Sequence, residues 1–249
     1  MIPGSTRLFG RSGGSLLGIA LAISSQVATA AEFSVTPIRA ELKPGTLSET
    51  ITVTNESPGK LRVSVKLVEW TQDEKGADVY KDSTDLVYFP RQMDLEPGTK
   101  RLVRVGAKAP STGSEKTYRL FLEEVPEANA AGSSMVNFYF RFGVPVFLPP
   151  ANAKPQPTVG EPTLVAGKMT IPVSNPGNQH FRLHRVIVTD GGTFRQEVAG
   201  WYSLAGTQRV YTTDIPRDTC RRGGTLAVRL EGENVSWDRK LNVDPASCS

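Results

Sequence analysis

The sequence has few residues of the kinds on which catalytic and metal centres depend. Among its 249 residues it has two histidines and two cysteines. His180 and His184 have no third ligand and no glutamate in the metalloprotease position. There is no G-x-S-x-G motif, no glycine-rich phosphate loop opening a helix, and no cysteine beside a histidine. We therefore expect no enzyme activity, no metal and no cofactor.

A sustained helical pattern is also missing, and short alternating runs take its place. Over residues 61–67, Leu and Val occupy the odd positions and polar residues the even ones. This two-residue period is typical of a half-buried strand. Glu96-Pro97-Gly98 has the composition of a turn between such strands. Strands separated by turns at this spacing predict an all-β sandwich or barrel.

The N-terminal residues carry the pattern of a secretory signal. A basic region with Arg7 and Arg11, an apolar run over residues 16–27 and a small-x-small sequence at 28–30 follow in order. We expect a signal peptide over residues 1–30 and an exported mature protein. Without the two arginines, Lys+Arg falls from 29 to 27 against 25 Asp+Glu, a net charge of +2. This small charge argues against a general nucleic-acid or anionic-membrane surface.

The two cysteines, Cys220 and Cys248, are expected to form a disulfide. In an exported chain pairing is the default, because the compartment is oxidising. Their separation is 248 − 220 = 28 residues, and closing such a loop stabilises the chain by roughly 3 to 4 kcal/mol in the chain-entropy model. The alternative is a pair of free redox thiols, but the spacing is not C-x-x-C.

Prolines mark a boundary between two predicted β domains. The stretch 149–157 contains four prolines, which favour an extended, semi-rigid connector. Alternating runs resume after it. We therefore place one domain at residues 31–150, a linker at 151–156 and a second domain at 157–249.

The most distinctive segment is a long aromatic strand over residues 135–148. One face of this predicted strand is apolar. That face holds Val136, Phe138, Phe140, Phe142, Val144 and Val146. Pro145 cannot donate to a ladder, which indicates an edge strand or a strand end. Two interpretations follow: a core strand whose phenylalanines fill a sandwich, or an edge used for β-strand addition to a partner.

Four segments, taken in order, resemble the periplasmic chaperones of the chaperone–usher pilus pathway, the PapD-like family. Each segment matches a strand or turn of that family, and together they cover most of the chain after residue 30. The segments are Pro-Ile-Arg-Ala-Glu-Leu at 37–42, Thr-Val-Thr-Asn-Glu-Ser at 52–57, the turn and strand over 90–105, and Tyr-Arg-Leu-Phe-Leu-Glu-Glu-Val-Pro at 118–126.

The resemblance implies a fold and a function. The fold would be two immunoglobulin-like sandwiches in a boomerang arrangement. The protein would stabilise pilus or fimbrial subunits by donating its long strand, with Val136, Phe138, Phe140 and Phe142 as the subunit-binding side chains. It would then deliver each subunit to an outer-membrane usher, with no nucleic-acid partner and no membrane insertion. Whether the free protein self-associates through the same edge is open.

The resemblance also implies two basic residues that bind the subunit's C-terminal carboxylate. Arg39 stands at the first position. Gly143 stands where better-known members carry lysine, and Arg141, two residues earlier on the same face, is the expected substitute. The cysteine pair and the Val-Pro-Val-Phe-Leu-Pro-Pro strand end look more like the archaic branch of the family.

Two other classes of function are left open. A structural pilus subunit or adhesin would have one incomplete sandwich, whereas this sequence contains two sets of strands. A carbohydrate-binding module would need an exposed aromatic platform. Trp70, Trp201 and Trp237 are widely scattered in the sequence.

Overall fold

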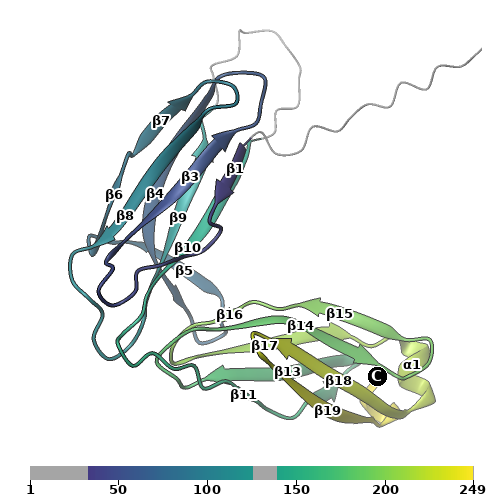
Figure 1. The fold of residues 1–249 in the computed structure, drawn as a ribbon. Coiled ribbons are helices and arrows are strands. Elements are labelled where there is room, and N and C mark those ends of the chain that lie inside the picture. The colour runs from purple at the N-terminus through teal and green to yellow at the C-terminus, as the bar shows by residue number, and fades with distance from the viewer. Residues whose placement is uncertain (1–32, 126–138, 249) are drawn as a thin grey trace, which may run out of the picture. The chain divides into compact units, whose positions relative to one another are not determined.

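The computed structural model describes residues 33–125 and 139–248 (Figure 1). The predicted signal peptide and the predicted subunit-binding residues Val136 and Phe138 lie outside the described residues. Nearly all regular elements are strands, as the alternating runs predict. No helix of the described ranges is both long enough and apolar enough to span a bilayer.

The first sandwich is built from the strands between residues 33 and 148. One sheet has the order β1-β3-β8-β6, and the other has the order β2-β10-β9-β4-β5 with β7 paired to β4. The strands are β1 (Phe33–Thr36), β2 (Ala40–Glu41), β3 (Ser48–Asn55), β4 (Leu61–Gln72), β5 (Asp78–Asp82), β6 (Leu86–Phe89), β7 (Gln92–Leu95), β8 (Lys100–Ala107), β9 (Lys116–Glu124) and β10 (Arg141–Leu148).

Strict alternation along β4 explains how this sandwich closes. Leu61, Val63, Val65 and Leu67 are buried in one core cluster, while the residues between them face outward. This is the pattern predicted from the sequence. Burying a side chain of this size stabilises the fold by about 1.5–3 kcal/mol, so a one-residue slip of register would be strongly unfavourable.

The second sandwich uses the strands between residues 158 and 243. Its sheets have the orders β11-β13-β12, with β17 paired to β13, and β15-β14-β18-β19, with β16 paired to β14. The elements are β11 (Thr158–Val159), β12 (Thr163–Val165), β13 (Lys168–Asn175), β14 (Phe181–Thr189), β15 (Arg195–Ala199), β16 (Tyr202–Ser203), β17 (Thr207–Asp214), α1 (Arg217–Arg222), β18 (Gly224–Gly232), β19 (Val235–Val243) and the 3-10 helix η1 (Pro245–Cys248). The architecture of two immunoglobulin-like sandwiches is therefore confirmed.

The predicted disulfide closes the C-terminal end of the second sandwich. Cys220 of α1 and Cys248 of η1 are bonded, with their Cα atoms 5.9 Å apart. Cys220 is fully buried in the second core cluster, and Cys248 packs against it. The disulfide thus ties the last described turn of the chain to the core.

A small apolar cluster joins the two sandwiches. This junction cluster consists of Trp70, Phe147, Tyr202 and Leu204, all buried. The imidazole of His180 stacks on Phe147 with ring centroids 3.7 Å apart.

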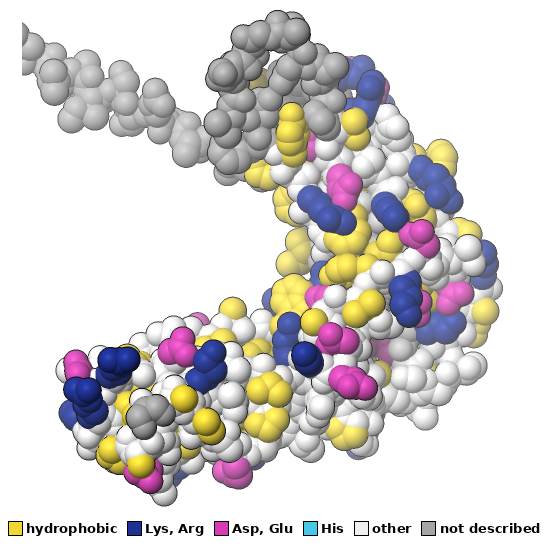
Figure 2. Space-filling model, turned by 180° about the vertical axis from the view of Figure 1, so that it is seen from behind, with side chains coloured by type: hydrophobic (Ala, Val, Ile, Leu, Met, Phe, Trp, Pro, Cys, Tyr) yellow, Lys and Arg dark blue, Asp and Glu magenta, His cyan; other side chains and the backbone are white. Residues whose placement is uncertain are grey.

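The surface carries both signs of charge. In the view of Figure 2, Lys and Arg side chains are interspersed with Asp and Glu. This distribution agrees with the small net charge.

Candidate functional site

Strand β10 has an open edge. It pairs with β9 along its whole length, from Arg141↔Glu123 to Leu148↔Lys116. On its other side, among the described strands, it pairs only with β2, through Val146 and Phe147. Within the described residues, the part of β10 from Arg141 to Pro145 has no strand on that side. Unpaired edges are templates for a further strand.

The two faces of β10 have different surroundings. Val144 and Val146 are buried in the first core, and Phe140 and Phe142 are partly buried and pack against it. The ring centroid of Phe142 lies 4.9 Å from that of Phe33. The described phenylalanines of the apolar face therefore contact the chain's own core. By alternation, Arg141, Gly143 and Pro145 point to the opposite face of the sheet.

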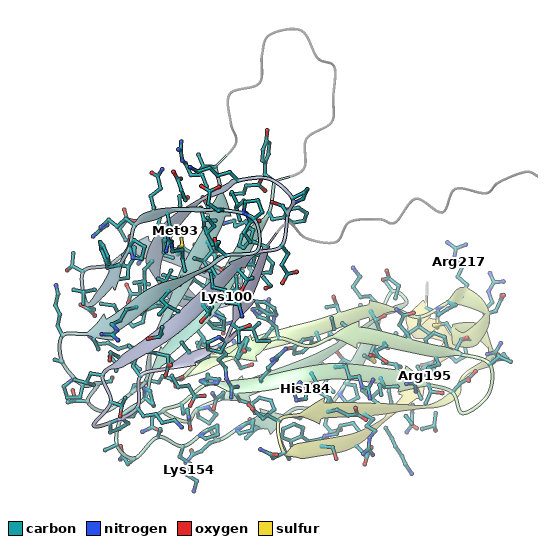
Figure 3. All side chains as sticks on the ribbon, turned by 45° about the horizontal axis from the view of Figure 1, so that its top comes forward. Met93, Lys100, Lys154, His184, Arg195 and Arg217 are labelled. Carbon is teal, nitrogen blue, oxygen red and sulfur yellow. A yellow bond between two sulfur atoms is a disulfide. The ribbon has the colours of Figure 1, made fainter. Side chains whose placement is uncertain are left out.

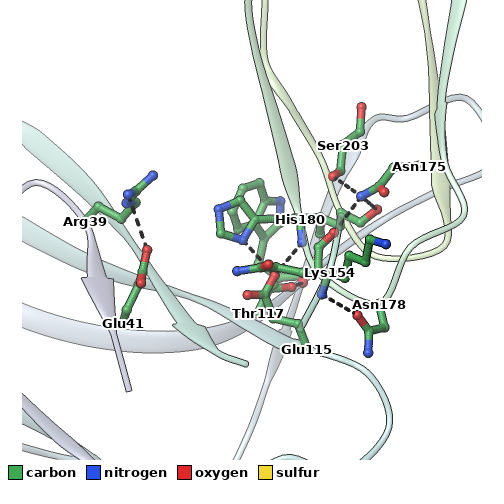
Figure 4. Close-up of polar contacts among 12 residues, drawn as sticks. Arg39, Glu41, Glu115, Thr117, Lys154, Asn175, Asn178, His180 and Ser203 are labelled. Atoms are coloured by element: carbon green, nitrogen blue, oxygen red, sulfur yellow. Dashed lines mark hydrogen bonds and ion pairs between the residues drawn. The ribbon is translucent and has the colours of Figure 1, made fainter. Parts of the chain in front are cut away.

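Arg39 lies where the open edge of β10 ends. It directly precedes β2, which runs parallel to β10 with Ala40 opposite Val146. Its neighbour along β10 is therefore Pro145. One guanidinium nitrogen, Nη2, lies 3.3 Å from Oε1 of Glu41 (Figure 4).

A second carboxylate also binds Arg39. Nη1 of Arg39 lies 3.3 Å from Oε1 of Glu233, which belongs to the second sandwich. Burial of the guanidinium lowers the pKa of Arg39, but the carboxylates of Glu233 and Glu41 outweigh this and raise it. Arg39 therefore remains a permanent cation that already attracts carboxylates.

Arg119 is a functional candidate that the sequence analysis missed. It lies on β9 opposite Pro145, on the same face as Arg39, because Tyr118 and Leu120 point into the core. Arg39, Pro145 and Arg119 thus form a row across neighbouring strands. Two strand spacings place the Cα atoms of the two arginines about 10 Å apart.

The guanidinium of Arg119 is buried without a counter-ion among the described residues. The residue is 6% exposed. Its Nη1 donates a hydrogen bond to the carbonyl of Gly143 at 2.8 Å. Its Cζ lies 4.1 Å from the ring centroid of Trp70 and 5.3 Å from that of Trp201. Nε and Nη2 have no hydrogen-bond partner in the described part of the chain. Buried charges are normally paired.

Gly143 lies against Phe121 and Arg119 of the neighbouring strand. A Cβ added at Gly143 would lie 3.1 Å from the ring of Phe121 and 3.8 Å from Cδ of Arg119. A larger side chain there would require Phe121 to move. A cation, Arg119, lies on the strand next to Gly143. In the sequence, Arg119 is recognisable only as the single arginine within the alternating run 118–126.

Arg141 lies farther along the sheet. It is four residues before Pro145 on β10, a rise of about 13 Å. Its Nε lies 2.6 Å from Oε1 of Glu123, and its guanidinium covers the ring of Phe121 at 3.8 Å. The structure therefore brings Arg39 and Arg119 into one row and leaves Arg141 outside it.

The histidines have different surroundings. His180 is buried, and its Nδ1 lies 2.8 Å from Oε2 of Glu115 (Figure 4). His184 is exposed on β14 (Figure 3). Within residues 33–125 and 139–248, no group of three or more His, Cys, Asp or Glu side chains could hold a metal ion.

The three tryptophans do not form one surface. Trp70 is fully buried. Trp237 packs edge-on against Phe181 beside the second core, with ring centroids 5.5 Å apart. Trp201 is 37% exposed and lies next to Arg119. This arrangement does not support an aromatic platform for carbohydrate.

Comparisons with known proteins agree with this architecture. Residues 32–154 match the family model described as the pili and flagellar-assembly chaperone, PapD N-terminal domain. No curated protein sequence matches the chain.

Solved structures with the same fold include chaperones, some of them in complex with a pilus subunit. One is from the CsuC–CsuE chaperone–tip adhesion subunit pre-assembly complex of archaic Csu pili of Acinetobacter baumannii. It has a TM-score of 0.62 and 17% identity, over 84% of this chain and 98% of that one. The CupB2 chaperone of Pseudomonas aeruginosa has a TM-score of 0.54 and 17% identity, over 85% and 100%.

The third structure is the Salmonella enterica SafA pilin in complex with the SafB chaperone. It has a TM-score of 0.54 and 15% identity, over 87% of this chain and 98% of that one. Residues 32–154 therefore belong to the PapD N-terminal domain family of pili and flagellar-assembly chaperones, and the chain shares the two-sandwich fold of these structures over most of its length.

Proposed function

We propose that this protein is a periplasmic chaperone that captures pilus subunits by β-strand addition and delivers them to an outer-membrane usher. The observation that carries the proposal is the open edge of β10, which ends beside the cation of Arg39. An edge supplies backbone hydrogen bonds to an added strand, and a cation at its end sets the register. The Csu and Saf structures contain a chaperone together with a subunit or pilin.

The donated side chains are those of the alternating face before β10. Val136 and Phe138 continue the parity of Phe140 and Phe142. A subunit that lacks one strand exposes an apolar groove, and these side chains would cover it. Because Phe140 and Phe142 already pack against the chaperone's own core, Val136 and Phe138 carry most of the proposed contact.

The C-terminal carboxylate of the subunit binds Arg39 and a second cation. Arginine suits this role because its planar donors match a carboxylate. Arg141 is the candidate that the sequence indicates. Arg119 is the candidate that the pairing of β9 with β10 favours, since it shares a row with Arg39. Its Nε and Nη2 atoms are buried and have no hydrogen-bond partner within the described residues.

The proposal also includes a location in the periplasm, delivery to an usher and membership of the archaic branch. The periplasm rests on the signal-peptide pattern at residues 1–30. Delivery to an usher rests on the family. The archaic branch is supported by the strand-end sequence and by the likeness to the Csu complex, which is described as archaic.

The proposal is tested by capture from periplasmic extract with tagged protein. The native chain should retain a small β-rich subunit, and Arg39→Ala should reduce its yield roughly tenfold or more, because a carboxylate is left without its cation. Arg104→Ala is the matched control, since Arg104 is exposed on β8 in the other sheet. Equal capture by native protein and Arg39→Ala would refute the anchor. Retention of sugar chains would favour the carbohydrate-binding alternative.

A further inference from the structure

The cation proposed to anchor the ligand is already bound by a carboxylate of the other sandwich. Among the described residues, two contacts between basic and acidic side chains join the first sandwich to the second: the Arg39–Glu233 ion pair and the contact of His180 with Glu115. The His180–Glu115 pair is almost entirely buried. The Arg39–Glu233 pair is partly exposed, with side-chain exposures of 35% and 40%. It is therefore accessible to a competing ligand.

The turn that carries Glu233 is held in a defined position. It connects β18 to β19, and the backbone N–H of Glu233 donates to the carbonyl of Arg182 at 3.0 Å. A Cβ added at Gly232 would lie 2.2 Å from the ring of Phe181, so only glycine allows this close approach. Asn234 completes the turn with φ of 62°. The backbone of the turn thus presents the Glu233 carboxylate to Arg39.

The contact between Arg39 and Glu233 is weaker than the best contact that an arginine can make with a carboxylate. It is a single approach of 3.3 Å from Nη1 to Oε1. A favourable arginine–carboxylate pair has two parallel hydrogen bonds of about 2.7–2.9 Å. A ligand carboxylate able to form two such bonds would gain more from Arg39 than Glu233 does.

Glu41 also binds Arg39, but it belongs to the same sandwich and directly follows Ala40 in β2. Its backbone lies in β2, opposite Phe147 of β10. Glu233 lies outside any strand, in a turn of the other sandwich. A ligand that binds Arg39 can therefore displace Glu233 by a side-chain rotation, without breaking a strand pairing.

We infer that Glu233 is an internal competitor: its carboxylate occupies Arg39 in the free chain and is displaced by the C-terminal carboxylate of an incoming subunit. This inference rests on the proposed role of Arg39. It assigns Glu233 a part in specificity, because a ligand without a well-placed carboxylate does not displace it. Displacement also removes the Arg39–Glu233 ion pair between the sandwiches, so ligand binding weakens the contact between them.

The test uses acetate as a carboxylate probe on the full protein. Acetate is titrated at constant ionic strength against chloride, and the Nε–Hε signal of Arg39, assigned with Arg39→Lys, is followed by NMR. Glu233→Gln keeps the size of the side chain and removes its charge. We expect the acetate dissociation constant of Glu233→Gln to be roughly two- to fivefold lower than that of the native protein. This fold-change corresponds to the free energy of an exposed ion pair.

Glu161→Gln is the matched control. Glu161 makes a similar single contact of 3.3 Å with an arginine, Arg239, within the second sandwich. We expect acetate binding in this variant to equal that of the native protein, and both variants to unfold at similar temperatures. Equal acetate dissociation constants in Glu233→Gln and native protein would overturn the inference. An equal gain of acetate affinity in Glu161→Gln would also overturn it.

Failure of this inference is distinguishable from failure of the proposed function. If Arg39→Ala abolishes capture while Glu233→Gln leaves acetate binding unchanged, Arg39 is the anchor and Glu233 is not a competitor. If Arg39→Ala retains capture, the anchor itself is wrong, whatever the acetate titration shows.

Discussion

At the scale of single residues, the most informative feature is an arginine that has no counter-ion among the described residues. Arg119 is 6% exposed and rests on Trp70. A cation over an aromatic face gains about 2 kcal/mol or more when desolvated. That gain offsets only part of the cost of burying a charge. A residue retained at such a cost is better explained by binding than by stability.

This argument predicts opposite effects of one substitution on stability and on capture. Arg119→Met keeps the length of the side chain and removes the charge. We expect its free energy of unfolding to be unchanged or higher, because apolar replacements of buried charges are often neutral or stabilising by about 1–4 kcal/mol. We expect its capture of the subunit to fall strongly. Denaturant unfolding and the pull-down from periplasmic extract measure the two effects.

Arg141→Met is the comparison for that variant. Arg141 is paired with Glu123 and half-exposed, so its loss should change stability little. If Arg141→Met loses capture and Arg119→Met retains it, the second anchor is Arg141, as the sequence indicates. A large loss of stability in Arg119→Met would show that Arg119 is structural.

The sequence could predict Arg39 but not Arg119, for a physical reason. Arg39 lies in a local segment whose neighbours carry the family resemblance. The proximity of Arg119 to Gly143 depends on the register of β9 and β10, which places Phe121 opposite Gly143 and Arg119 opposite Pro145. Register between strands separated by a long connection cannot be obtained from alternation alone.

At the scale of elements, the alternation of apolar and polar residues predicts which segments form strands. It predicts less well whether a strand lies in the core or at an edge. The buried and exposed sides of β4 follow directly from residues 61–67. For β10 the same pattern allows both a core strand and a donor edge, because both require a two-residue apolar period. In the structure the apolar face of β10 joins the core, and its outer edge is largely unpaired among the described residues. Donation of this edge to a subunit stays a prediction.

The donor interpretation predicts that the two sides of this strand respond differently to charge. Phe138→Asp places a carboxylate on the face proposed to enter the subunit's groove, where an unpaired charge is strongly unfavourable. We expect it to abolish capture of the subunit. Tyr139→Asp is the control, because Tyr139 has the opposite parity and is 51% exposed.

Solubility of the co-expressed subunit and yield in the pull-down are the measurements. We expect the subunit to remain soluble with Tyr139→Asp and to aggregate with Phe138→Asp. If both variants capture the subunit equally, the donated strand lies elsewhere.

At the scale of the whole molecule, the two sandwiches differ in how they are stabilised. The first core has no disulfide among its described residues. The second contains the bond between Cys220 and Cys248. In the chain-entropy model this bond stabilises the folded state by roughly 3 to 4 kcal/mol, a large part of the 5–15 kcal/mol typical of a domain. The redox state of the compartment should therefore affect the second sandwich first.

The last prediction follows from this asymmetry. In the double variant Cys220→Ser with Cys248→Ser, we expect the backbone amides of residues 158–243 to lose protection in hydrogen exchange, because their unfolded state gains entropy. The amides of residues 33–148 should keep most of theirs. Reduction of the native protein should have the same effect, and the native protein under oxidising conditions is the control. Equal loss of protection in both ranges would mean that the junction cluster of Trp70, Phe147, Tyr202 and Leu204 couples the sandwiches into one cooperative unit. In that case the disulfide would stabilise the subunit-binding edge of β10 as well, although it lies in the other sandwich.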